Sequence, residues 1–157
     1  MTPPNHWLFF PAPVASGVKF QIEATLSSVA RANRFNISSG TFSGTDNVAN
    51  NYEVYSSEPI RKATTYMEMI TKLKSGGDYA TNGDWRTAVN ANGGLDNATS
   101  TWTHDGATLT TTSVSSNHGS TGSTIIRVRW NGSSTDITNF WNTLAAGEVS
   151  TIKMNWT

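Results

Sequence analysis

The sequence predicts a mainly β protein: an antiparallel β-sandwich or jelly-roll-like domain with one short helix near the C-terminus. Several segments alternate apolar and polar residues with the period of two that a half-buried strand requires. Thr, Ser and Asn supply 23, 18 and 15 of the 157 residues. Thr favours strands, whereas Ser, Asn and Gly favour turns. One segment near the C-terminus shows the spacing of an amphipathic helix.

The chain is expected to begin with an extended arm, residues 1–17, followed by a single β-rich domain, residues 18–157. The arm contains Pro3, Pro4, Pro11 and Pro13, which exclude a regular helix or a central strand. Its central residues are too apolar to remain in water: Trp7, Leu8, Phe9 and Phe10. Two interpretations stay open, because the arm could cover the domain's own sheet or reach a neighbouring subunit as an assembly arm.

The first half of the domain reads as a series of strands. Residues 18–26 give the clearest alternation, residues 33–42 a weaker one, and residues 52–56 a short third strand after a Gly/Asn-rich loop, residues 44–51. Residues 64–74 are ambiguous because their apolar positions fit both a strand and a helix. The β neighbours and the turn sequence that follows favour a strand.

The second half begins with residues 78–97, which are predicted to be mostly loop around a short apolar-centred segment, residues 85–89. Residues 101–104 and 107–114 then form a predicted hairpin, with Asp105 and Gly106 as the type I′ dipeptide at its tip.

The clearest unit in the chain is a strand–helix–strand over residues 123–156. Residues 124–130 and 151–156 alternate as strands. Between them, Ile137, Phe140, Trp141 and Leu144 lie on one helical face. We expect Ser134 or Thr135 to cap this helix and Gly147 to mark its end. By their phase, Trp130, Trp141 and Trp156 are expected to meet in one core cluster.

Composition and charge exclude several classes of function. The chain has no cysteine, and its 11 basic and 11 acidic residues balance, so we expect neither a thiolate site nor binding to nucleic acid or to an anionic membrane. No apolar run is long enough to cross a bilayer. No catalytic motif, metal-ligand pattern or cofactor-binding motif is present. We therefore predict a non-enzymatic protein without a cofactor.

The best candidates for binding are two tryptophans in polar surroundings. Exposed indole rings can stack on sugars, so Trp85 and Trp102 suggest a glycan site with Asn82, Asp84, His104 and Asp105 as hydrogen-bonding partners. The alternative is that both rings fill the core. The same loop carries Asp78, Asn82 and Asp84, an oxygen-rich set that could hold calcium but is equally typical of turns.

In overall style the chain resembles bacteriophage virion structural proteins, either capsid decoration (cement) proteins or tail and fibre components. The resemblance lies in the Pro-rich apolar arm, the hydroxyl-rich strands such as residues 107–114, and the absence of cysteine and of an export signal. It implies a protein made in the host cytoplasm and located in the virion. Its partners would be further copies of itself, as a trimer or another symmetric oligomer, and other virion proteins. The alternative is a carbohydrate-binding or receptor-binding lectin-like module.

Overall fold

The computed structural model describes residues 17–91, 99–111 and 122–156. These residues form an antiparallel sheet of nine strands, accompanied by three helices, so the predicted mainly β fold is confirmed. The strands are β1 (Phe20–Ser27), β2 (Arg34–Ser43), β3 (Tyr52–Val54), β4 (Ile60–Lys62), β5 (Tyr66–Leu73), β6 (Thr99–His104), β7 (Ala107–Thr111), β8 (Ile125–Asn131) and β9 (Val149–Asn155). The helices are α1 (Val48–Asn51), α2 (Asn82–Ala91) and α3 (Ser134–Trp141).

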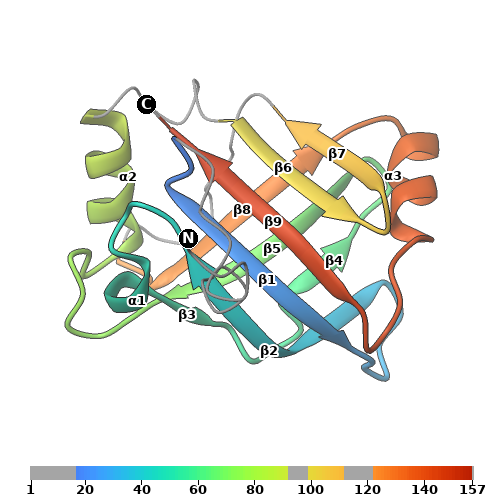
Figure 1. Cartoon of the computed structure of the whole chain (residues 1–157), viewed down its shortest axis with the longest axis horizontal. Coiled ribbons are helices and arrows are strands. Elements are labelled where there is room, and N and C mark those ends of the chain that lie inside the picture. Colours follow the sequence, from blue (N-terminus) through green and yellow to red (C-terminus); the bar gives the residue numbers. More distant parts are fainter. Residues whose placement is uncertain (1–16, 92–98, 112–121, 157) are drawn as a thin grey trace, which may run out of the picture.

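The sheet folds over into two layers that share β2. The front layer runs β7–β6–β9–β1–β2, and the back layer runs β2–β4–β5–β8, with β3 on the same edge of β5 as β4. Figure 1 shows the strands of one layer crossing those of the other. Residues 36–43 of β2 pair with β1, whereas Arg34 and Phe35 pair with β4. The register with β1 shifts at Ser38, and such a bulge bends a strand, here where β2 passes between layers.

One hydrophobic core lies between the layers and is closed at each end by a helix. Trp102 of β6 and Trp130 of β8 meet edge to face with ring centroids 5.1 Å apart, and Phe140 of α3 packs on Trp102. At the opposite end, α2 brings Trp85 against Trp156. Figure 1 shows α2 and α3 at these two ends. In the described residues, no helix combines the length and apolarity needed to cross a bilayer.

The ambiguous segment, residues 64–74, forms the strand β5, as predicted. Its inner face carries Met67 and Met69, and its outer face also buries Glu68 and Ile70. Burial on both faces explains the ambiguity, because Ile70 adds an apolar residue to the outer face and creates an accidental helical spacing.

Three elements were not predicted. Residues 82–91 form α2, where a loop was expected, because Trp85 and Val89 face the core one turn apart. The loop expected at residues 44–51 contains the short helix α1, and β4 follows Pro59.

The C-terminal helix forms as predicted but has different ends. Its N-cap is Ser133 rather than Ser134 or Thr135, and the Ser133 hydroxyl accepts a hydrogen bond from the Asp136 backbone N–H at 3.1 Å. The helix ends at Trp141, well before Gly147. Trp130 and Trp156 are buried as expected, but Trp141 is only partly buried and packs on Phe35.

The predicted hairpin forms between β6 and β7. Asp105 and Gly106 both have positive φ, 48° and 79°, as a type I′ turn requires. Residues 112–114, the end of the second predicted strand, lie outside the described residues.

Candidate functional site

The two tryptophans proposed for glycan stacking are completely buried, so that prediction is wrong. Trp85 and Trp102 are each 0% exposed. The Trp85 indole N–H donates to the Tyr52 hydroxyl at 2.9 Å, and Trp102 packs between the layers on Trp130. Neither ring offers a face to a sugar.

The polar residues of that predicted site are not brought together either. Asn82 is buried and donates to the Ile125 carbonyl at 2.9 Å, which ties α2 to β8. Asp84 is exposed on α2, whereas Asp105 is exposed in the β6–β7 turn near α3, at the other end of the molecule (Figure 1). The assembly-arm residues Trp7, Leu8, Phe9 and Phe10 lie outside the described residues.

His104, the last of these residues, belongs to a constellation that sequence reasoning missed. Its Nδ1 lies 2.5 Å from Ser150 Oγ, and its Nε2 lies 3.2 Å from Glu148 Oε1. A serine, a histidine and an acid in this order are the components of a nucleophilic triad. However, Ser150 is 0% exposed and faces inward with Ile152, so a substrate cannot reach its hydroxyl. We read these contacts as a polar tie between β6 and β9.

A second polar cluster surrounds Asp46 at the α2 end. The carboxylate accepts hydrogen bonds from the Tyr52 and Tyr79 hydroxyls. Burial raises the pKa of Asp46, although both hydrogen bonds act in the opposite direction. Asp78, from the loop considered for calcium, accepts from the Asn47 and Asn51 side chains instead. In the described part of the chain, no three His, Asp or Glu side chains gather into a metal-binding group.

The strongest charge feature lies on the outer face of the back layer. Strand register places Arg34 opposite Arg61, Arg61 opposite Glu68, and Glu68 opposite Arg129. These four residues form one row across β2, β4, β5 and β8. Arg127 lies two residues before Arg129 and therefore faces the same side. We define the arginine face as Arg34, Arg61, Arg127 and Arg129 around Glu68.

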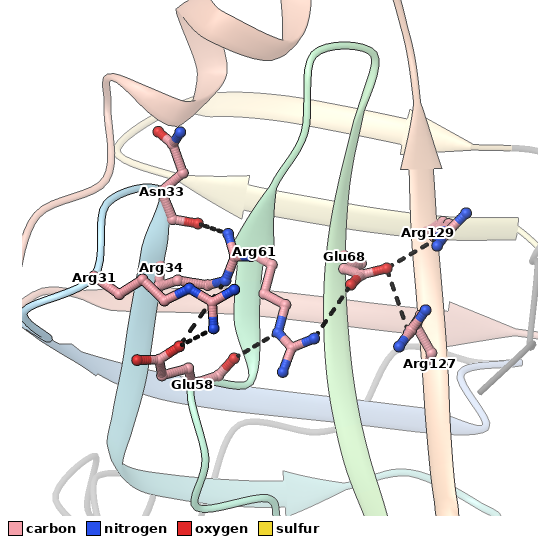
Figure 2. Close-up of polar contacts among 8 residues, drawn as sticks. All are labelled: Arg31, Asn33, Arg34, Glu58, Arg61, Glu68, Arg127 and Arg129. Atoms are coloured by element: carbon pink, nitrogen blue, oxygen red, sulfur yellow. Dashed lines mark hydrogen bonds and ion pairs between the residues drawn. The ribbon is translucent and has the colours of Figure 1, made fainter. Parts of the chain in front are cut away.

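Glu68 is the centre of this face and is only 4% exposed. As Figure 2 shows, three guanidinium groups converge on its carboxylate. Arg129 Nε donates to it at 3.0 Å, Arg127 Nε lies 3.5 Å away, and Arg61 Nη1 lies 4.0 Å away. The Arg129 guanidinium also stacks over the Tyr66 ring, 4.2 Å from its centroid.

A second acid, Glu58, serves the other side of the face. Its carboxylate lies 4.0 Å from Arg34 Nε and 3.6 Å from Arg31, and its backbone carbonyl accepts from Arg61 Nε at 3.2 Å (Figure 2). A pocket of about 240 Å³ opens among the side chains of the arginine face. This face carries four of the chain's six arginines, and Arg31 lies beside it.

The sequence carried one signal for this face. Arg127 and Arg129 alternate with buried residues on β8, so both had to point outward. Their meeting with Arg61 and Glu68 depends on pairing between strands far apart in the chain. The net charge of the chain is balanced, and a net charge carries no information about where on the surface the arginines gather.

The chain matches no protein-family model, no curated protein and no solved structure.

Proposed function

We propose that this chain is a non-enzymatic structural protein of a virion, which self-associates and stabilises a larger particle. One observation supports self-association above all: in the part of the chain that the structure describes, the front layer ends in an edge strand with a neighbour on one side only.

That edge is β7, which among the described residues pairs with β6 alone. Its sequence, Ala-Thr-Leu-Thr-Thr, contains no charge and no proline. Natural proteins commonly protect exposed edge strands with one of these features, because an unpaired edge recruits another chain. Residues 107–110 therefore offer backbone groups to which a further strand can be added.

A groove of about 460 Å³ lies beside this edge, between β7 and α3. Its apolar lining comes from Ala107, Leu109 and Phe140, and Asp136 and Asn139 supply polar groups. A segment that pairs with β7 and also fills this groove needs apolar side chains for the groove. It also needs backbone N–H groups for the strand pairing, so its paired residues cannot be prolines.

The occupant that we propose is the arm of a second copy, through its residues 1–16. Residues 5–10, Asn-His-Trp-Leu-Phe-Phe, lie between prolines with no proline among them, and the last four are apolar. An arm of 16 residues can extend roughly 50 Å, enough to reach a neighbour. The arm of the same copy could also reach β7, because only β9 and β6 lie between β1 and β7, and the oligomeric state distinguishes the two arrangements.

Blocking the edge with charge tests this arrangement. We expect the full-length chain to be an oligomer in size-exclusion chromatography with light scattering. The double variant Thr108→Lys/Thr110→Lys is expected to be a monomer, because both side chains are exposed on β7 and lysine disfavours edge pairing. Removal of residues 1–16 is expected to have the same effect.

The matched control is Thr101→Lys/Thr103→Lys, which places the same charges on the outer face of β6. Both edges of β6 are already paired, so this variant should keep the oligomer. A monomeric full-length chain would refute self-association. An oligomer that survives the β7 lysines but not the arm deletion would show that the arm binds elsewhere.

The virion location is tested on particles. Antibodies raised against the purified chain should label phage particles from the source culture at regular positions in negative-stain electron microscopy. Unlabelled particles, with the chain found only free in the lysate, would contradict this part of the proposal.

A further inference from the structure

We infer that the arginine face is a binding site for a phosphate group, held in the pocket beside Glu68. The pocket is formed by side chains of β2, β4, β5 and β8, and its volume of about 240 Å³ far exceeds the ~10–15 Å³ that one water needs. The site is remote in the sheet order from the β7 edge, so it stands independently of self-association.

The charges lining the pocket are strongly unbalanced. Four arginines line it together with one carboxylate, that of Glu68, and a second carboxylate, that of Glu58, lies 4.0 Å from Arg34 Nε. If the arginines served only to neutralise Glu68, one or two would suffice, yet three approach it and a fourth, Arg34, lines the same pocket. The excess of positive charge suits a dianion such as phosphate better than a single carboxylate.

The guanidinium groups are held in place before any ligand arrives. Arg129 is fixed by Glu68 and by the Tyr66 ring, and Arg61 donates to the Glu58 carbonyl. Arg34 is held by its Nη1 hydrogen bond to the Asn33 carbonyl at 2.9 Å. Preorganised side chains lose little conformational entropy on binding, and arginine forks match the oxygens of phosphate.

Arg34 supplies the most specific indication that the pocket accepts an anion. Its Nε is buried and, among the described residues, has no hydrogen-bond partner; Glu58 is 4.0 Å away. In addition, Arg34 lies directly opposite Arg61 in the β2–β4 pair, an arrangement of like charges that is unfavourable by itself. A phosphate oxygen between these two groups would satisfy the donor and relieve the repulsion.

The test is a titration of the full-length chain with inorganic phosphate in a chloride buffer, followed by calorimetry and by the ¹⁵N–¹H signals of the arginine Nε groups. We expect saturable binding in the millimolar range or tighter, with the signals of Arg34, Arg61 and Arg129 shifting together. Arg34→Gln should weaken binding about tenfold or more, the loss expected for a charge-assisted hydrogen bond. Arg34 does not contact Glu68, so this variant leaves the central ion pairs in place.

Arg86→Gln is the matched control, because it removes the same charge from α2, outside the pocket. It should bind phosphate as the unmodified chain does. Equal losses in the two variants would mean that net charge alone attracts the ion, and a titration without saturation would also overturn the inference.

Titrations with different anions show whether the site selects phosphate, and whether it prefers a phosphate ester or the free ion. O-phosphoserine should compete with inorganic phosphate, and the tighter of the two indicates whether the natural ligand is an ester or the free ion. Acetate should bind far more weakly. Acetate as tight as phosphate, or a short single-stranded oligonucleotide whose affinity rises with its length, would refute a site built for one phosphate group.

Discussion

Asp46 joins three segments of the α2 end through its two carboxylate oxygens. Tyr52 from β3 and Tyr79 from the loop before α2 both donate to it, and Tyr52 in turn accepts from Trp85. Burial, and next the charge of Asp46, raise the pKa of Tyr52, so this hydroxyl stays protonated and acts as a donor. The chain of contacts therefore connects a buried indole to a half-buried carboxylate.

The pKa values of the two aspartates in this region, Asp46 and Asp78, are predicted to shift in opposite directions from their ordinary value. Burial raises the pKa of Asp46 above its ordinary 3.8, so its contribution to stability is present below pH 3.8 and is lost as the pH rises through the folded pKa. Hydrogen bonds from Asn47 and Asn51 lower the pKa of Asp78, so its contribution is present above pH 3.8 and is lost as the pH falls. A ¹³C carboxyl NMR titration should place the Asp46 midpoint above that of Asp78.

Tyr79→Phe sharpens this prediction. It removes a hydrogen bond that lowers the pKa of Asp46, so the Asp46 midpoint should rise further. Tyr55→Phe is the control, because Tyr55 has no part in this network. The network would be absent in solution if the Asp46 titration midpoint were the same with and without Tyr79→Phe, or if it lay below pH 3.8 in the unmodified chain.

At the scale of the element, α3 depends on a cap, Ser133, that sequence patterns placed one or two residues too late, at Ser134 or Thr135. Ser133→Ala removes the hydroxyl that accepts from the Asp136 N–H, and we expect a loss of about 1 kcal/mol in the free energy of unfolding. Ser134→Ala, one residue further on, should change stability by less than about 0.5 kcal/mol. Urea denaturation measures both, and equal losses would contradict the cap assignment.

Strands were more predictable than helices in this chain for a physical reason. β1, β8 and β9 each have one apolar and one polar face, and this alternation is visible in the sequence alone. In α2, by contrast, only Trp85 and Val89 supply the apolar stripe, and Gly83 and Asn90 are poor helix formers. Packing against the core stabilises this helix, and packing is not visible in local sequence.

The candidate site was hidden for a different reason. Alternation on β8 predicts that Arg127 and Arg129 share a face, but nothing local predicts that Glu68 lies opposite Arg129. The same limit explains the error on Trp102. Its neighbours are polar along the chain, whereas across the layers it meets Trp130 and Phe140.

At the scale of the whole molecule, the core between the layers dominates stability. Trp102 touches both the opposite layer and α3, so Trp102→Ala should cost roughly 3–5 kcal/mol in the free energy of unfolding. Trp141→Ala should cost less, roughly 1–3 kcal/mol, because Trp141 is only partly buried beside Phe35. Thermal and urea denaturation of both variants give the order, and a reversed order would mean that α3 packs differently.

The position of β9 has a consequence for biosynthesis. This strand, Val149–Asn155, lies between β1 and β6 and pairs with both, so it joins the earliest strand of the front layer to the later hairpin. A ribosome releases the chain from its N-terminal side, and β1 must therefore wait for more than a hundred further residues before its second neighbour emerges. Until then only β2 can pair with β1, and the surfaces meant for β9 stay exposed. The front layer can therefore complete its pairing only after β9 has emerged, and until then the edges of β1 and β6 that face β9 are exposed surfaces of the kind that chaperones bind.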